Sequence, residues 1–157
     1  VKSNIVKDVL ENIERYSAAN NHYVFEITET IEMDQIPAVQ NVFKEFVKNE
    51  FRFAIDDFGT GYSNYGYMRD RTFDIVKVDR SFVTDIDKLK DNYLMVSFII
   101  KMAHEMGLHV CIEGVETKEE LSCVKKLGAD YIQGYYYGKP VCLQDFEEQH
   151  LKRFVLG

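Results

Sequence analysis

The chain has 157 residues, 46% of them hydrophobic and 29% charged, which is enough for one globular domain with its own core. Its formal net charge of −7 argues against binding to duplex nucleic acid, which depends on Lys and Arg neutralising phosphates. No apolar run approaches the roughly 20 residues that cross a bilayer, and no signal peptide opens the chain, so we expect membrane contact only through other domains of a parent protein.

Helical and strand patterns alternate along the chain. Helices are predicted where apolar residues recur at helical spacing, over 5–16, 37–47, 94–106, 117–127 and around 146–155. Short apolar runs predict strands over 23–27, 51–55, 73–78, 108–112 and 131–132. The second helix is expected to bury Val39, Val42, Phe43, Phe46 and Val47. Strands separated by helices indicate right-handed βαβ units and therefore a parallel sheet.

Helix ends are marked by a few residues with known end preferences. Gly107 is expected to stop the third helix and Gly128 the fourth, because glycine tolerates the left-handed backbone that follows a helix. Thr117 and Glu120 have the capping-box spacing that opens a helix.

The cysteines and histidines give no sign of a disulfide framework or a zinc site. Cys111, Cys123 and Cys142 are odd in number and lack metal-type spacing, so buried, reduced thiols are expected for the first two. The four histidines are scattered, without an H-x-x-x-H pair. Reduced thiols favour a cytoplasmic location, either alone or as the cytoplasmic part of a larger sensor protein.

Polar residues recur where the predicted strands end. In parallel α/β folds the chemistry gathers at the carboxyl ends of strands, and polar side chains at one end of successive apolar strands are hard to explain by packing. The residues in these places are Glu26, Asp56, Asp57, Lys77, Glu113 and Gln133.

The adjacent Asp56 and Asp57 have two interpretations. Two neighbouring carboxylates repel each other unless a hard cation such as Mg²⁺ or Mn²⁺ neutralises them, and an Asx-type turn at the end of a strand is the alternative. Gly59-Thr60-Gly61 follows, but Asn64 stands where a dinucleotide fingerprint needs its third glycine, so a Rossmann loop is not predicted.

Lys77 and the tyrosine run also leave alternatives open. Lys77 lies between two valines, so its side chain is expected to point into the sheet or barrel interior, where it needs an anionic partner for either an ion pair or catalysis. Tyr135, Tyr136 and Tyr137 are suited either to stacking on a base or to packing at the rim of a barrel.

Five segments together closely resemble the second half of the EAL domain family, which hydrolyses the bacterial messenger cyclic di-GMP to linear pGpG. In chain order they are Phe25–Glu29, Asp56–Ser63, Val76–Val83, Glu113–Thr117 and Gln133–Tyr135. The resemblance implies a TIM-barrel-like (β/α)₈ variant, truncated to about five parallel strands with their helices. Residues 1–157 would form this partial EAL domain, from a helix before the E-I-T-E strand to the C-terminal helix.

The resemblance also implies roles for individual residues in a site with two Mg²⁺ or Mn²⁺ ions. The implied metal ligands are Glu26, Asp56, Asp57 and Glu113, and the implied catalytic residues are Lys77 and Glu113. Glu116 and Gln133 match residues on the guanine or water-binding side of the pocket. Glu29, Gly59, Thr60 and Gly61 match the residues that anchor a loop coupling the site to dimerisation.

Two parts of the family pattern are absent from the 157 residues. The Glu-Ala-Leu motif and a metal-binding Asn of the family are not among them, and the first residue is Val1, so we expect a fragment that is inactive alone. An open, five-stranded sheet is expected to be completed by a homodimer or by another segment. A catalytically incompetent cyclic di-GMP-binding or regulatory module is the alternative function, and a non-enzymatic interaction scaffold is a third.

Overall fold

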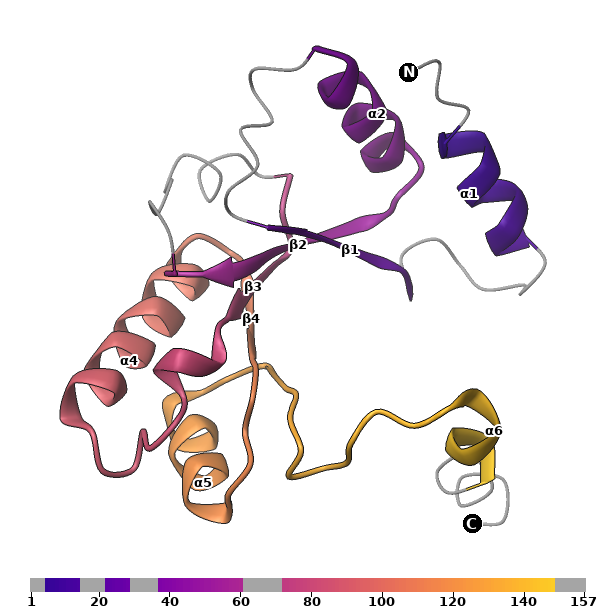
Figure 1. Ribbon diagram of the computed structural model, residues 1–157. Coiled ribbons are helices and arrows are strands. Elements are labelled where there is room, and N and C mark those ends of the chain that lie inside the picture. Colours follow the sequence, from indigo (N-terminus) through magenta and orange to yellow (C-terminus); the bar gives the residue numbers. More distant parts are fainter. Residues whose placement is uncertain (1–4, 15–21, 29–36, 61–71, 149–157) are drawn as a thin grey trace.

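Five parallel strands form one sheet in a computed structural model that describes residues 5–14, 22–28, 37–60 and 72–148 (Figure 1). Neighbouring strands in the chain are neighbours in the sheet, so the order is β1-β2-β3-β4-β5. The strands are β1 (Val24–Thr28), β2 (Arg52–Phe58), β3 (Ile75–Val78), β4 (His109–Ile112) and β5 (Tyr131–Ile132). The predicted strands are therefore confirmed, and β2 is longer than expected because it continues through both aspartates.

Described helices separate β1 from β2, β3 from β4 and β4 from β5, as the βαβ pattern predicts, while residues 61–71 between β2 and β3 lie outside the described ranges. They are α1 (Ile5–Glu14), α2 (Pro37–Lys48), α4 (Lys90–Glu105), α5 (Lys118–Leu127) and the short α6 (Leu143–Phe146), with a 3₁₀ turn η3 (Arg80–Phe82) after β3. The expected α/β fold with a parallel sheet is confirmed. The part of the predicted last helix beyond 148 lies outside the described residues.

The two faces of the sheet differ in chemistry because side chains alternate along each strand. One face carries residues such as Phe53, Val76 and Val110, which join the main buried core together with partly buried side chains of α1, α2, α4 and α5. The other face carries a small separate cluster of Ala54, Ile75 and Cys111. By this alternation, Glu26, Asp56 and Lys77 near the strand ends lie on the second face.

An aromatic cluster fills the core between α2 and the first strands. The ring of Phe53 lies 4.1 Å from that of Phe43 and 5.8 Å from that of Phe25, centroid to centroid. On α2, Phe46 is buried as expected, and Val42 and Phe43 are partly buried. The expectation for Val47 is wrong, because this side chain is 39% exposed on the outer side of the helix. The side chain of Val39 lies outside the described residues.

The predicted helix ends are confirmed. The Thr117 side chain accepts a hydrogen bond from the Glu120 amide, and the Glu120 carboxylate accepts one from the Thr117 amide, which completes the capping box. Gly107 and Gly128 adopt φ angles of 79° and 91°, in the left-handed region that favours glycine.

All three cysteines are free thiols, with Cys111 buried, Cys123 partly buried and Cys142 exposed. Burial raises the pKa of the Cys111 thiol to about 11, so this group stays protonated at neutral pH. Within the described ranges, none of the helices has the length and apolarity needed to span a membrane.

We predict that Leu108→Ala lowers the free energy of unfolding by about 2–5 kcal/mol, because Leu108 is 5% exposed in the main core and its removal leaves a cavity. The matched control is Leu143→Ala, since Leu143 is 72% exposed and its removal should change little. Urea unfolding followed by circular dichroism measures both. Equal effects of the two substitutions would contradict the placement of the core.

Candidate metal-binding site at the end of the sheet

Lys77 connects carboxylates from three other strands or strand ends. Its ammonium nitrogen lies 2.7 Å from Asp56 Oδ1 on β2, 2.8 Å from Glu26 Oε2 on β1 and 2.9 Å from Glu113 Oε1 after β4. Lys77 is on the central strand β3 and is only 6% exposed, so an unpaired charge here would be costly. An ammonium group has three N–H donors, and each of them has a carboxylate partner in this arrangement.

The pKa values of Lys77 and Glu113 reflect both burial and neighbouring charges. Burial by itself would lower the pKa of Lys77, but its hydrogen bonds to Asp56, Glu26 and Glu113 outweigh that effect and raise the pKa above its ordinary value. Burial raises the pKa of Glu113, and the neighbouring Lys77 opposes this rise. Lys77 is therefore charged at neutral pH and neutralises part of the negative charge of the three carboxylates.

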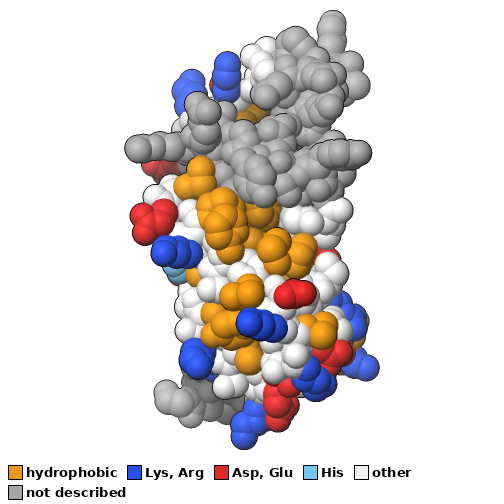
Figure 2. Space-filling model, turned by 90° about the vertical axis from the view of Figure 1, so that its left-hand side faces the viewer, with side chains coloured by type: hydrophobic (Ala, Val, Ile, Leu, Met, Phe, Trp, Pro, Cys, Tyr) orange, Lys and Arg blue, Asp and Glu red, His pale blue; other side chains and the backbone are white. Residues whose placement is uncertain are grey.

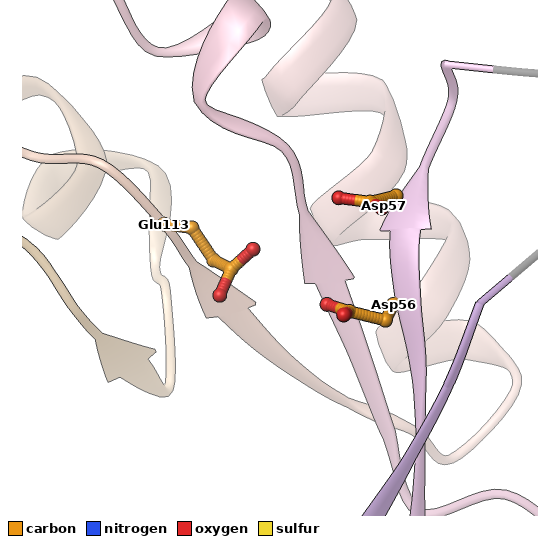
Figure 3. A group of neighbouring side chains, drawn as sticks. All are labelled: Asp56, Asp57 and Glu113. Carbon is orange, nitrogen blue, oxygen red and sulfur yellow. The ribbon is translucent and has the colours of Figure 1, made fainter.

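The neighbouring side chains of Asp56 and Asp57 point toward the same site because the strand is irregular there. Adjacent residues of a regular strand point to opposite faces, but the register between β2 and β3 shifts between Ile55 and Phe58. Asp57 has a φ of 54°, a left-handed conformation that Asp tolerates better than most residues. In Figure 3 both aspartate carboxylates point toward the side on which Glu113 lies. Asp56, Asp57 and Glu113 each offer an oxygen, and these atoms all lie within 4.8 Å of one another.

This donor set fits a hard divalent cation. All three candidate ligands offer carboxylate oxygens, which Mg²⁺, Mn²⁺ and Ca²⁺ prefer, and no soft ligand joins the group among the described residues. Two of the carboxylates, those of Asp56 and Glu113, are also bound by Lys77. Glu26 binds Lys77 but is not part of the three-carboxylate group. The metal-ligand roles of all four carboxylates stay predictions.

The residues predicted to face the substrate lie around the same end of the sheet. Glu116 forms an ion pair with Arg80, 3.0 Å from Oε1 to Nη2, and Gln133 is exposed directly after β5. A backbone hydrogen bond joins the segments that carry Glu116 and Gln133, since the Val115 amide donates to the Gln133 carbonyl at 3.2 Å. Gly114 has a φ of 70°, and a side chain there would collide with Arg80.

The turn after Asp57 contains two of the predicted loop residues. The amide and the hydroxyl of Thr60 both donate to the Asp57 carbonyl, at 3.2 and 2.9 Å. Gly59 has a φ of 95°, and its Cα lies so close to the ring of Phe82 that a Cβ atom would be 2.9 Å away. Glu29 and Gly61, the other two residues of this prediction, lie outside the described residues.

Two residues near the site were not predicted to take part in it. Arg80 lies within the segment Val76–Val83, but the sequence alone did not indicate its pairing with Glu116. Glu120 was predicted only as a helix cap, although its carboxylate also accepts a hydrogen bond from the amide of Asp85. The capping-box spacing was the only sequence signal for Glu120, and it did not indicate this contact between distant segments.

The described fold is similar to solved structures of EAL proteins. Among solved structures, the EAL enzyme Bd1971, in a form with cAMP and cyclic di-GMP bound, is 34% identical with a TM-score of 0.84 over 93% of this chain and 39% of that chain. BlrP1 of Klebsiella pneumoniae, in a manganese and cyclic di-GMP complex, is 28% identical with a TM-score of 0.77 over 86% of this chain and 34% of that chain. The sheet is therefore part of a TIM-barrel-like α/β domain.

The sequence comparisons agree with this class. A family model described as "EAL domain" matches residues 1–140, so the chain belongs to the EAL domain family. Cyclic di-GMP phosphodiesterase PdeL of Escherichia coli (strain K12) is 32% identical over 137 residues, which are 86% of this chain and 37% of PdeL. The chain spans 14% to 20% of the length of several other curated relatives.

We predict that Lys77→Met lowers the free energy of unfolding at pH 7 in EDTA by about 2 kcal/mol or more, because it leaves three close carboxylates without their cation. The deficit should shrink as the pH falls toward 4, since protonated carboxylates no longer repel each other.

The matched control for this prediction is Lys88→Met. Lys88 binds Asp85 at 2.6 Å but is 70% exposed, so its loss should have a much smaller effect and little pH dependence. Urea unfolding at several pH values measures both variants. A deficit of Lys77→Met that matches the control, or that does not change with pH, would contradict the proposed neutralisation.

Proposed function

We propose that this chain supplies the metal-binding and lysine side of a cyclic di-GMP phosphodiesterase site. The observation that carries the proposal is the oxygen-only group of Asp56, Asp57 and Glu113 next to the buried Lys77. Family membership supports the substrate, since PdeL is a cyclic di-GMP phosphodiesterase and Bd1971 has been solved with cyclic di-GMP bound. Residues 1–157 are proposed to be a partial EAL domain.

Each side chain has a proposed role in the hydrolysis. Asp56, Asp57 and Glu113, with Glu26 nearby, would hold Mg²⁺ or Mn²⁺. When bound, such a cation would neutralise the phosphate oxygens and make water a better nucleophile. Lys77 would orient the carboxylates and stabilise the negative charge that develops on the phosphate, and Glu113 would orient the attacking water and take its proton.

The remaining residues are proposed to bind the substrate and connect the site to its surroundings. Glu116 and Gln133 can offer an acceptor and an amide to the guanine edge, and both side chains are exposed. Gly59 and Thr60, together with Glu29 and Gly61, are proposed to anchor the loop that couples the site to dimerisation. The close packing of Gly59 on Phe82 supports a restrained start of this loop.

We propose that the 157 residues do not hydrolyse the substrate alone. They span 39% of the solved Bd1971 chain and 34% of BlrP1, so most of each relative's structure has no counterpart in them. A binding or regulatory module without turnover is the second candidate, and it makes a different prediction for a completed domain.

We predict that a chimera of PdeL, with these residues replacing the matching segment, hydrolyses cyclic di-GMP to pGpG in Mn²⁺ and loses this activity in EDTA. Asp56→Ala and Lys77→Ala should each lower the rate at least about 100-fold, because they remove a metal ligand or the cation that stabilises charge. The matched control Asp145→Ala, on α6, should change the rate less than about twofold.

The outcomes of this experiment separate the candidate functions. Release of pGpG by the 157 residues alone would contradict the proposed incompleteness. Full activity of the Asp56→Ala chimera would contradict the metal assignment. A chimera that binds cyclic di-GMP without hydrolysing it would favour the binding module.

A homodimer is proposed to form through the outer face of α4. Leu94, Met95 and Phe98 are 53%, 46% and 58% exposed, and Figure 2 shows hydrophobic side chains among charged ones on this side of the molecule. Asp91 and Lys101 extend the same helix face at helical spacing. In a two-fold antiparallel pair, Asp91 of one copy would meet Lys101 of the other, so the face is complementary to itself.

We predict that the chain sediments as a dimer and that Phe98→Glu converts it to a monomer, because a charge would be buried in the apolar contact. Leu143→Glu is the control, since Leu143 is 72% exposed on α6 and away from α4. Analytical ultracentrifugation measures the state of each protein. A wild-type monomer at high micromolar concentration, or a dimer that Phe98→Glu leaves unchanged, would contradict the proposed interface.

A further inference from the structure

The carboxylate of Glu120 is buried and accepts hydrogen bonds from three backbone amides. Its side chain lies in the first turn of α5, and the residue is 5% exposed. Oε2 accepts hydrogen bonds from the amides of Glu116 and Thr117, at 2.9 and 3.0 Å, and Oε1 accepts one from the amide of Asp85 at 3.1 Å. A capping box needs only the bond to Thr117, so two of these three bonds go beyond helix capping.

No ion pair within 4.0 Å involves Glu120 among the residues that the structure describes. Burial would raise the pKa of this carboxyl, but the hydrogen bonds from the backbone and from Thr117 outweigh that effect and lower it. The group is thus a carboxylate at neutral pH. A buried anion that accepts several N–H bonds is costly to replace, because its removal leaves those donors without an acceptor.

The three amides belong to the two loops that flank the candidate site. Glu116 and Thr117 end the loop that begins with Glu113 at the end of β4. Asp85 lies in the turn that follows η3, in the segment between β3 and α4. Asp85 also has a φ of 57°, an uncommon left-handed backbone for a residue other than glycine, and its amide is one of those bound by Glu120.

We propose that Glu120 is a positioning residue that fixes the Glu113–Thr117 loop against the segment after Lys77. Its two oxygens bind one loop each, so the carboxylate determines how far apart the two loops lie. The Glu113 side chain then stays within reach of Asp56 and Asp57, and Glu116 stays paired with Arg80. This role rests on the proposed metal site and adds a residue that contacts neither metal nor substrate.

The experiment compares Mn²⁺ binding by the 157-residue wild-type chain with that of Glu120→Ala, Glu120→Gln, Glu119→Ala and Glu119→Gln. Glu119 is the matched control, because it is exposed, carries the same charge and lies in the same helical turn. Electron paramagnetic resonance counts free Mn²⁺ at a temperature where circular dichroism finds every variant folded.

Glu120→Ala should weaken Mn²⁺ binding about tenfold or more, the effect expected when support behind a metal ligand is lost. Glu120→Gln keeps one acceptor oxygen and should lie between Glu120→Ala and wild type, while both Glu119 variants stay within about twofold of wild type. Amide hydrogen exchange of Asp85, Glu116 and Thr117 should accelerate in Glu120→Ala and not in Glu119→Ala.

Three results would overturn the inference, and they are distinguishable. Equal Mn²⁺ affinities of wild type and a folded Glu120→Ala would leave the metal site standing and reduce Glu120 to a structural cap. Unchanged exchange at the three amides would contradict the connection between the loops itself. A wild-type chain that binds no Mn²⁺ would remove the metal site and the positioning role together.

Discussion

The binding of one lysine by carboxylates from three neighbouring strands is the interaction on which the rest of this site depends. Lys77 lies on the central strand, and Glu26, Asp56 and Glu113 approach it from both sides within 2.9 Å. Without the ammonium group, these carboxylates would repel each other across the sheet. With the ammonium group of Lys77 in place, the strand ends can hold three carboxylates close together even when no divalent cation is bound.

This arrangement constrains the backbone as well as the side chains. The parallel register aligns the strand ends, and the irregular end of β2 allows Asp57 to join Asp56 on the same side. The main core lies on the opposite face of the sheet, where the helices pack. Among the described residues, no helix packs into the small cluster on the face that carries the site, so this face is open to the proposed cation.

Much of this could be predicted from the sequence, because alternation and strand order depend on local patterns. The five strands, the capping box and the gathering of polar residues at one sheet end all followed from such patterns. The partners of Lys77 did not, since Asp79 is nearest in sequence but its carboxylate accepts from the Ser81 amide instead. The bond from Asp85 to Glu120 joins residues 35 positions apart and left no local signal. The exposure of Val47 likewise depends on how α2 is rotated against the sheet.

The most direct test of the central claim is an anomalous scattering map from crystals of the chain grown with Mn²⁺. The account predicts a manganese peak contacted by oxygens of Asp56, Asp57 and Glu113, with the ammonium group of Lys77 close by. A map without a peak at saturating Mn²⁺, or with manganese bound only by other carboxylates, would contradict it.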